Sequence, residues 1–177
     1  PGQSDLAWAS FPCQDLSLAG GGAGLKGDRS GMFWPFQELM VPLGKKGRAP
    51  RIIAIENVCG TLTSHGGKDF SAICSALVQA GYRFGAVIID AALFLPQSRP
   101  RLFILAIRND VEIPQELIDA GPSRLWHTNT LKTAHEKLPP KARNNWIWWS
   151  LPVTAKRNTR FTDLIEDRPE SVSWHTA

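Results

Sequence analysis

Cys13 is the residue of this chain whose type and position point most directly to chemistry. It stands between Pro12 and Gln14, after the apolar run of residues 6–11 and before a glycine-rich stretch. A cysteine at the point where a strand passes into a loop presents its thiol at the carboxyl edge of a sheet, where α/β proteins build their sites. A thiol that loses its proton readily is a nucleophile near neutral pH. Most cysteines are instead small core residues, and we expect that of Cys74.

Glu56 is the second residue that could act on a substrate. It follows the apolar residues 52–55 and precedes Asn57 and Val58. A carboxylate at the end of a buried strand is costly unless it has a partner. The sequence leaves two roles open for Glu56, a structural ion pair and a proton donor to a bound substrate.

Two arginines come directly before the last strand that the sequence predicts. Residues 97–101 read Gln-Ser-Arg-Pro-Arg and include Gln97, Arg99 and Arg101. Two arginines that lie two residues apart on an extended segment point to the same side. They are therefore either a clamp for an anionic group or ordinary surface charge.

The elements that must position these residues alternate between strands and helices. Runs of apolar residues predict strands, and apolar residues at helical spacing predict helices. The predicted strands are Leu6–Phe11, Arg51–Val58, Phe84–Asp90 and Leu102–Ile107, and the predicted helices are Met32–Leu43 and Lys68–Tyr82. This order implies an α/β fold with a largely parallel sheet. The last two strands have no helix between them, so we expect that pair to be antiparallel. We expect the first strand to be short and buried, and the second to be buried on both faces.

Composition and charge limit the class of protein. The chain has 177 residues, of which 43% are hydrophobic and 20% are charged, as in a soluble globular domain. No apolar run approaches the roughly 20 residues that span a bilayer. Three cysteines without metal-type spacing favour a reducing, cytoplasmic setting and no metal site. The chain starts Pro-Gly-Gln-Ser, which is neither an initiator Met nor a signal peptide, so we expect a fragment or a processed chain.

Basic residues concentrate in one part of the sequence. The net charge is +4, and residues 123–160 hold eight Lys or Arg, one acidic residue and four tryptophans. Basic residues among aromatic ones suit contact with nucleic acid. A solvated face over a tryptophan-anchored core explains the same composition, and the composition does not decide between the two.

Three segments, in this order and spacing, resemble the middle motifs of cytosine-5 DNA methyltransferases. They are residues 10–20, the Glu-Asn-Val of residues 56–58 and the Gln-Ser-Arg-Pro-Arg of residues 97–101. Residues 27–33 resemble the motif after the mobile loop of this family. Residues 148–152 with 163–165 resemble the stretch that leads into its target-recognition domain.

The resemblance implies a reaction and a role for each residue. In such enzymes the thiolate, here of Cys13, adds to carbon 6 of a cytosine that has left the double-stranded DNA, and S-adenosylmethionine then methylates carbon 5. Glu56 would contact ring nitrogen 3 and the exocyclic amine, and Arg101 the oxygen on carbon 2. The residues with supporting roles would be Pro12, Gln14, Ser17, Asn57, Gln97 and Arg99, and Met32 would lie beside the cofactor.

The resemblance runs from Leu6 to about Thr176 and covers the middle of the family pattern. It implies a partial Rossmann-like methyltransferase sheet, without most of the cofactor site and without the target-recognition domain. We expect residues 1–112 to be the catalytic part of the core, and residues 113–177 to be a basic, Trp-rich extension. The parent protein would be bacterial or phage-encoded, of restriction-modification type, and this chain alone would be inactive. The first strand would be an open sheet edge through which chains could associate.

Other interpretations stay open at this point. A cysteine hydrolase would pair Cys13 with His65, His127 or His135, although nothing in the sequence pairs them. A catalytically idle DNA-binding relative and a tRNA cytosine methyltransferase are the two further alternatives. Residues 22–27 fit the dinucleotide pattern Gly-x-Gly-x-x-Gly, but no predicted strand directly precedes them and no helix directly follows.

Overall fold

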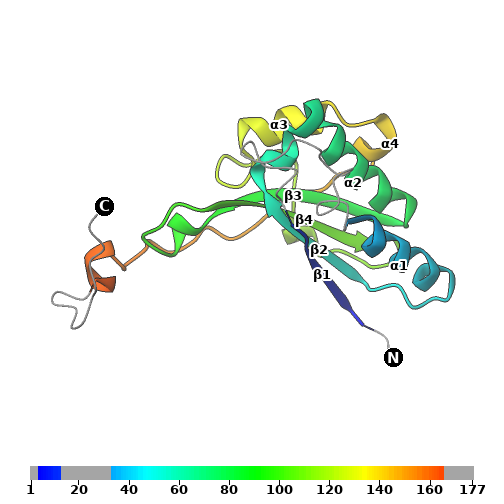
Figure 1. Ribbon diagram of the computed structural model, residues 1–177, viewed down its shortest axis with the longest axis horizontal. Coiled ribbons are helices and arrows are strands. Elements are labelled where there is room, and N and C mark those ends of the chain that lie inside the picture. Colours follow the sequence, from blue (N-terminus) through cyan, green and yellow to red (C-terminus); the bar gives the residue numbers. More distant parts are fainter. Residues whose placement is uncertain (1–3, 13–32, 166–177) are drawn as a thin grey trace, which may run out of the picture.

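The computed structural model describes residues 4–12 and 33–165, and its centre is a four-stranded sheet (Figure 1). The strands are β1 (Leu6–Ser10), β2 (Ile52–Val58), β3 (Tyr82–Asp90) and β4 (Pro100–Arg108). β1 and β2 are parallel, whereas β4 is antiparallel to both β2 and β3. Three strands therefore run in one direction and only β4 runs against them. This confirms the predicted sheet, mostly parallel with an antiparallel final pair.

The order of the strands is β1-β2-β4-β3, so the last strand is inserted between two earlier ones. The sequence pattern did not predict this insertion. Its consequence for function is direct, because β4 runs backwards and its first residues therefore lie at the same edge of the sheet as the last residues of β1 and β2. The end of β1, the end of β2 and the start of β4 meet there.

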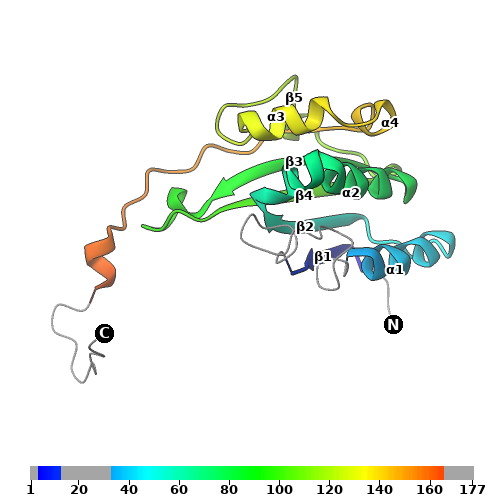
Figure 2. The same ribbon diagram turned by 45° about the horizontal axis from the view of Figure 1, so that its top comes forward.

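Four helices pack with one face of the sheet in the main core. They are α1 (Phe33–Lys45), α2 (Lys68–Gln79), α3 (Asn129–Glu136) and α4 (Pro140–Arg143). In Figure 2, α3 and α4 form the top layer, above α2 and the sheet. The predicted apolar face of α2 is confirmed, because Phe70, Ile73, Cys74 and Leu77 are all buried. Gly81 lies just past the end of α2 with a φ of 87°, a conformation that favours glycine.

The opposite face of the sheet is covered by a small two-stranded sheet of β5 (Ile118–Asp119) and β6 (Trp148–Trp149). Trp126, Ile147 and Trp149 pack there against Val87 of β3. The stretch after residue 112 thus contributes tryptophans to a buried cluster, and it supplies α3 and α4 to the main core. The predicted domain boundary after residue 112 stays a prediction.

β1 is one of the two edge strands of the sheet among the described residues, because β2 is its only neighbour there. The expectation that this strand is buried is wrong for three of its residues, namely Ser10 and the two large apolar residues Leu6 and Trp8. Leu6 is 51% exposed and Trp8 is 56% exposed, on the same face of the strand, because no described element covers that face. Ala9 and the following Phe11, which point the other way, are buried in the main core.

Five short 3₁₀ helices complete the described part of the chain. They are η3 (Cys59–Leu62), η4 (Ser64–Gly67), η5 (Ala91–Leu93), η6 (Gln115–Leu117) and η7 (Phe161–Leu164). The chain leaves the body after β6 and runs beside the β3–β4 connection to η7 (Figure 1). Arg157 fastens this run by donating to the carbonyls of Ala92 and Leu95.

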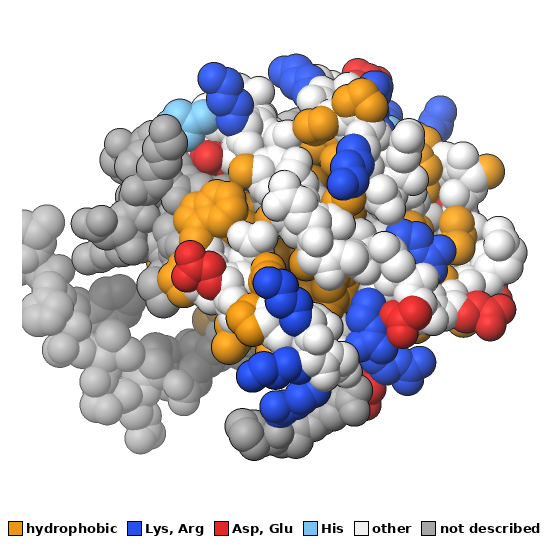
Figure 3. Space-filling view, turned by 90° about the vertical axis from the view of Figure 1, so that its right-hand side faces the viewer, with side chains coloured by type: hydrophobic (Ala, Val, Ile, Leu, Met, Phe, Trp, Pro, Cys, Tyr) orange, Lys and Arg blue, Asp and Glu red, His pale blue; other side chains and the backbone are white. Residues whose placement is uncertain are grey.

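The right-hand end of the molecule in Figure 1 is shown face-on in Figure 3. Lys and Arg side chains lie there among acidic and hydrophobic ones, so this end is not a uniform basic surface. Within the described ranges, no helix has both the length and the apolar character that crossing a membrane requires.

Candidate functional site

A cavity of about 300 Å³ lies at the edge of the sheet where β1 and β2 end and β4 begins. Eight residues line it: Ser10, Phe11, Pro12, Glu56, Asn57, Val58, Arg99 and Arg101. They come from three segments that are far apart in the sequence. Five of them are residues that the sequence predicted to serve the site, namely Pro12, Glu56, Asn57, Arg99 and Arg101.

Glu56 is held from both neighbouring strands. The Ser10 hydroxyl donates to its Oε2 at 2.5 Å, and Arg101 Nε lies 3.2 Å from its Oε1. The pairing register explains both contacts, because Ser10 stands beside Glu56 on β1, and Arg101 stands on β4 opposite Val58, two residues from Glu56 on the same face. The Glu56 and Arg101 side chains are 22% and 23% exposed, so the pair is open to a ligand in the cavity.

Asn57 points to the other face and ties the ends of two strands together. Its side chain is buried, and its Nδ2 donates to the carbonyl of Phe11 at 3.2 Å. Its Oδ1 accepts from the Val58 amide at 2.9 Å and from the Thr61 hydroxyl at 3.4 Å. Asn57 therefore fixes Phe11, which lies between the end of β1 and Pro12, relative to the start of η3.

Asp90 positions the two arginines, and sequence reasoning missed it. Its Oδ1 accepts from the amides of Ala92 and Arg99, and its Oδ2 accepts from the Ser98 hydroxyl. The backbone bonds, with the Ala92 bond foremost, lower the pKa of this carboxyl. A carboxylate that ends a strand directly before a short helix is a recognisable capping signal, and it could have been read from the sequence. Ser10 was also missed, and its only signal is its place at the end of β1.

Of the remaining predicted residues, only Gln97 belongs to the part of the chain that the structure describes. Gln97 is exposed, and the residues that line the cavity do not include it. Four lie outside the described residues, namely Cys13, Gln14, Ser17 and Met32, as does the Gly22–Gly27 pattern. Pro12, which precedes Cys13, is itself part of the cavity wall.

The other thiols of the chain differ from what a nucleophile needs. Cys59 and Cys74 are both free. Burial raises the pKa of the Cys59 thiol, and nearby Arg101 lowers it only in part. Cys74 is fully buried, as predicted, and burial raises the pKa of its thiol well above the usual value.

The histidines considered for a cysteine hydrolase lie elsewhere. His65 bonds to Asp69 at 2.9 Å, His127 accepts from the Ser123 amide at 2.8 Å, and His135 packs against two tryptophan rings. None of these three lines the cavity. Across residues 4–12 and 33–165, no group of three or more His, Cys, Asp or Glu side chains is placed to hold a metal ion.

The chain is similar to proteins of one known family. The family model described as C-5 cytosine-specific DNA methylase matches residues 1–176. The type II methyltransferase M2.BsuMI of Bacillus subtilis is 39% identical over 136 residues, covering 71% of this chain and 34% of that protein. The type II methyltransferase M.NgoFVII of Neisseria gonorrhoeae is 27% identical over 177 residues, covering 93% of this chain and 46% of that protein. The chain thus spans less than half the length of either relative.

Among solved structures, the chain is similar to the Dnmt2 methyltransferase of S. pombe. The sequence identity is 24% and the TM-score is 0.43, over 62% of this chain and 32% of that one.

Proposed function

Because the chain belongs to the family of C-5 cytosine-specific DNA methylases, we propose that it forms the cytosine-binding, catalytic part of a DNA cytosine-5 methyltransferase. The observation that carries the proposal is the Glu56–Arg101 pair in a cavity whose wall ends at Pro12, one residue before Cys13. A volume of about 300 Å³ is at the small end of ligand sites and suits a single base. A base enters such a cavity only after it leaves the duplex, at a cost of a few kcal/mol.

The first covalent step belongs to Cys13. Its thiolate forms a bond to ring carbon 6 of cytosine, and the electron pair of the carbon 5–carbon 6 double bond moves through carbon 4 to ring nitrogen 3. Nitrogen 3 takes a proton from Glu56, and carbon 5 becomes the nucleophilic carbon. At the end of the cycle a base removes the carbon 5 proton, the electron pair left behind re-forms the carbon 5–carbon 6 double bond, and the Cys13 sulfur leaves as a thiolate. Nitrogen 3 returns its proton to Glu56.

Glu56 and Arg101 orient the base for this step. One oxygen of Glu56 accepts from the exocyclic amine of cytosine while the other, when protonated, donates to nitrogen 3. Arg101 donates to the oxygen on carbon 2. Ser10, which donates to Glu56 at 2.5 Å, holds the carboxyl group in place while Arg101 turns toward the base. General acid catalysis of this kind contributes about 10²–10⁴ in rate.

The methyl donor implied by the family is S-adenosylmethionine, which supplies an electrophilic methyl group when bound. A nucleoside needs acceptors for its ribose hydroxyls, usually a carboxylate at the end of a strand. Glu56 is the carboxylate among the residues that line the cavity, and the proposal assigns both of its oxygens to the base. The residues that line this cavity therefore leave no carboxylate for the ribose of a nucleoside and do not fit one, and no cofactor contact is assigned to them. Met32 remains the residue proposed to lie beside the cofactor.

A covalent trap tests the proposal. The chain, with the sequence that flanks it in its natural protein, is mixed with S-adenosylmethionine and a pool of duplex DNA carrying 5-fluorocytosine. Fluorine cannot leave carbon 5 as a proton does, so the bond to sulfur persists through denaturation. We expect a mass-spectrometric adduct on Cys13 that is absent in Cys13→Ala. Cys59→Ala is the matched control and keeps the adduct, because Cys59 is not the nucleophile.

The opposite outcomes separate the alternatives. An adduct retained in Cys13→Ala would assign the reaction to another residue. No adduct with any DNA, together with an adduct on 5-fluorocytosine-containing tRNA, would reassign the substrate to RNA. No adduct with either substrate, in a protein that still binds DNA, would indicate the catalytically idle relative.

A further inference from the structure

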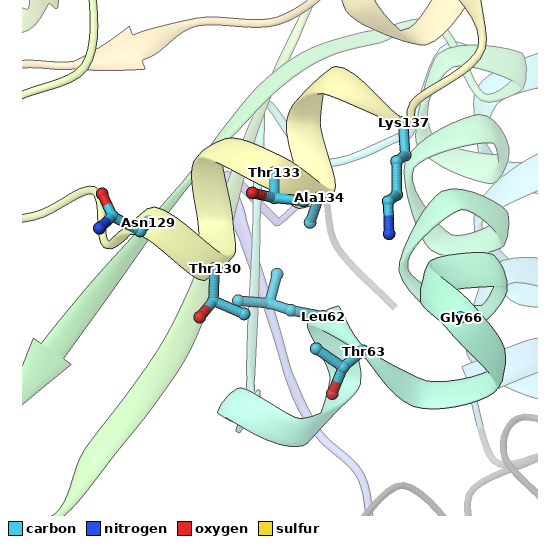
Figure 4. A pocket seen from close by; sticks show the side chains of 8 residues that line it. All are labelled: Leu62, Thr63, Gly66, Asn129, Thr130, Thr133, Ala134 and Lys137. Carbon is cyan, nitrogen blue, oxygen red and sulfur yellow. The ribbon is translucent and has the colours of Figure 1, made fainter.

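A second hollow lies beside the candidate site, between η3 and α3 (Figure 4). Its volume is about 400 Å³. Leu62, Thr63 and Gly66 line it from the η3–η4 segment, and Asn129, Thr130, Thr133, Ala134 and Lys137 line it from α3 and the residue after it. Figure 4 shows the Lys137 side chain reaching from the end of α3 into the space between α3 and the helix that follows η4. We call this hollow the α3 groove.

The α3 groove is lined by groups that donate hydrogen bonds, with a cation at one end. Three of its residues carry hydroxyl groups, one carries an amide, and Lys137 carries the charge. Leu62 and Ala134 are buried and form its apolar floor. No Asp or Glu lines the groove, which therefore suits an anion that offers several oxygen acceptors.

A neighbouring hollow of about 330 Å³ continues the α3 groove along α2 and shares Gly66 and Lys137 with it. Lys68, Ser71 and Ser75 add a second cation and two more hydroxyls, again without a carboxylate. The two lysines each have an acid next to them in the sequence, Asp69 beside Lys68 and Glu136 beside Lys137, and neither acid lines either hollow. Asp69 is buried and accepts from Ser64 and His65. Lys137 thus stands between two connected hollows, which favours an extended ligand over a single small ion.

The α3 groove lies within a short distance of the cavity that holds Glu56. Val58 lines that cavity and Leu62 lines the groove, and η3 joins them. Four residues span at most about 14 Å. One strand of duplex DNA advances about 3.4 Å along the axis per phosphate, so a strand whose base occupies the cavity places phosphates within reach of the groove.

We propose that the α3 groove binds the phosphate backbone of duplex DNA beside the target cytosine, with Lys137 as its ionic contact. This inference rests on the proposed function, because it takes DNA as the substrate. The groove contributes affinity that does not depend on base sequence, and it orients the duplex so that the target base faces the cavity.

The salt dependence of DNA binding tests this inference. Binding of the chain to a labelled random-sequence duplex is followed by fluorescence anisotropy from 50 to 200 mM salt, for the wild type and for Lys137→Gln. One lost phosphate contact reduces the slope of log K against log salt by about 1. We expect that reduction, and a several-fold weaker affinity at the lowest salt. Lys46→Gln is the matched control, because Lys46 is an exposed lysine in the turn after α1 and the same charge is removed.

Three outcomes overturn the inference, and they are distinguishable. An unchanged slope in Lys137→Gln, with wild-type DNA binding intact, overturns the groove and leaves the proposed function standing. If Lys46→Gln reduces the slope as much as Lys137→Gln does, the effect comes from net charge alone. The wild type could also fail to bind DNA but bind tRNA, with a salt-dependence slope that Lys137→Gln reduces. That result removes DNA as the ligand of the groove and contradicts the proposed function as well. Circular dichroism of both variants checks that they fold.

Discussion

At the scale of single residues, Asp90 decides where the two arginines of the site lie. Its carboxylate accepts from Ala92 at one end of the β3–β4 connection and from Ser98 and Arg99 at the other. The connection is thereby closed into a compact loop directly before β4. Arg99 and Arg101 enter the cavity because the loop fixes where β4 begins.

Replacing Asp90 should loosen this loop without unfolding the chain. In Asp90→Ala the amides of Ala92 and Arg99 lose their acceptor, and we expect both to exchange with deuterium about tenfold faster or more. Asp90→Asn is the matched control, because its Oδ1 still accepts from both amides. Hydrogen exchange measured by mass spectrometry compares the two. Equal exchange in Asp90→Ala and the wild type would show that the loop is held by other contacts.

The site was predictable from sequence where a residue type is unusual for its place. Glu56 stands out because it is a carboxylate at the end of an apolar strand, and Arg99 and Arg101 stand out because they precede another such strand. Glu56 and Arg101 do meet, at 3.2 Å. Ser10 was not predictable, because a serine at the end of a strand is unremarkable until the register sets it beside Glu56. The pattern of residue types carries no information on register between strands.

At the scale of elements, Gly85 allows the β5–β6 layer to approach the main sheet. It lies in β3, and a side chain there would meet the carbonyl of Ile147 and the indole ring of Trp149. The chain on either side of this contact is bonded to β3, since Phe84 accepts from the Ile147 amide and donates to the Asn145 carbonyl. A glycine inside a strand here serves the close approach of another backbone.

Gly85→Ala should therefore destabilise the fold. The added methyl group must displace the backbone of Ile147 and the ring of Trp149. Overpacking of this kind lowers the free energy of unfolding by about 1–3 kcal/mol. Urea unfolding followed by tryptophan fluorescence measures the loss. Gly121→Ala is the control and should change stability by less than about 0.5 kcal/mol, because nothing lies near its position. A Gly85→Ala midpoint equal to that of Gly121→Ala would contradict the tight packing.

Elements with strong periodicity were predictable, and their arrangement was not. The helix at Lys68–Gln79 and the strands ending at Val58 and Asp90 follow from apolar spacing alone. The strand order does not follow from apolar spacing, because the apolar pattern of β4 would suit a strand at the edge of a sheet as well as one in the middle. The role of the tryptophans in residues 123–160 also needed the structure, which buries Trp126 and Trp149 against the sheet.

At the scale of the whole molecule, two histidines connect stability to pH, the buried His127 and the half-buried His135. Burial is the main cause that lowers the pKa of His127 and of His135 below the ordinary value. His127 is 1% exposed, and its ring accepts from the Ser123 amide, a bond that requires an unprotonated nitrogen. The unfolded chain therefore binds protons more readily at these two positions than the folded chain does.

The free energy of unfolding should consequently fall as the pH is lowered through about 6.5, the ordinary pKa of histidine. Below the lowered pKa values of the folded state the decline from this source ends. Urea titrations at several pH values between 8 and 5 measure the dependence. His127→Asn, whose Oδ1 can accept from the Ser123 amide, should show a shallower decline. If the free energy of unfolding of His127→Asn falls as steeply with pH as that of the wild type, His127 is not a cause of the pH dependence.

The insertion of β4 between β2 and β3 also sets the order in which the chain can fold during synthesis. β2 is complete at Val58, but its partner on that side ends only at Arg108. β3 leaves the ribosome before β4, and if β3 paired with β2 it would exclude β4 from its position beside β2. We infer that the β3–β4 hairpin forms first, from neighbouring segments, and then docks on β2 as a unit. Until the ribosome has released Arg108, the apolar edge of β2 is open to pairing with other chains.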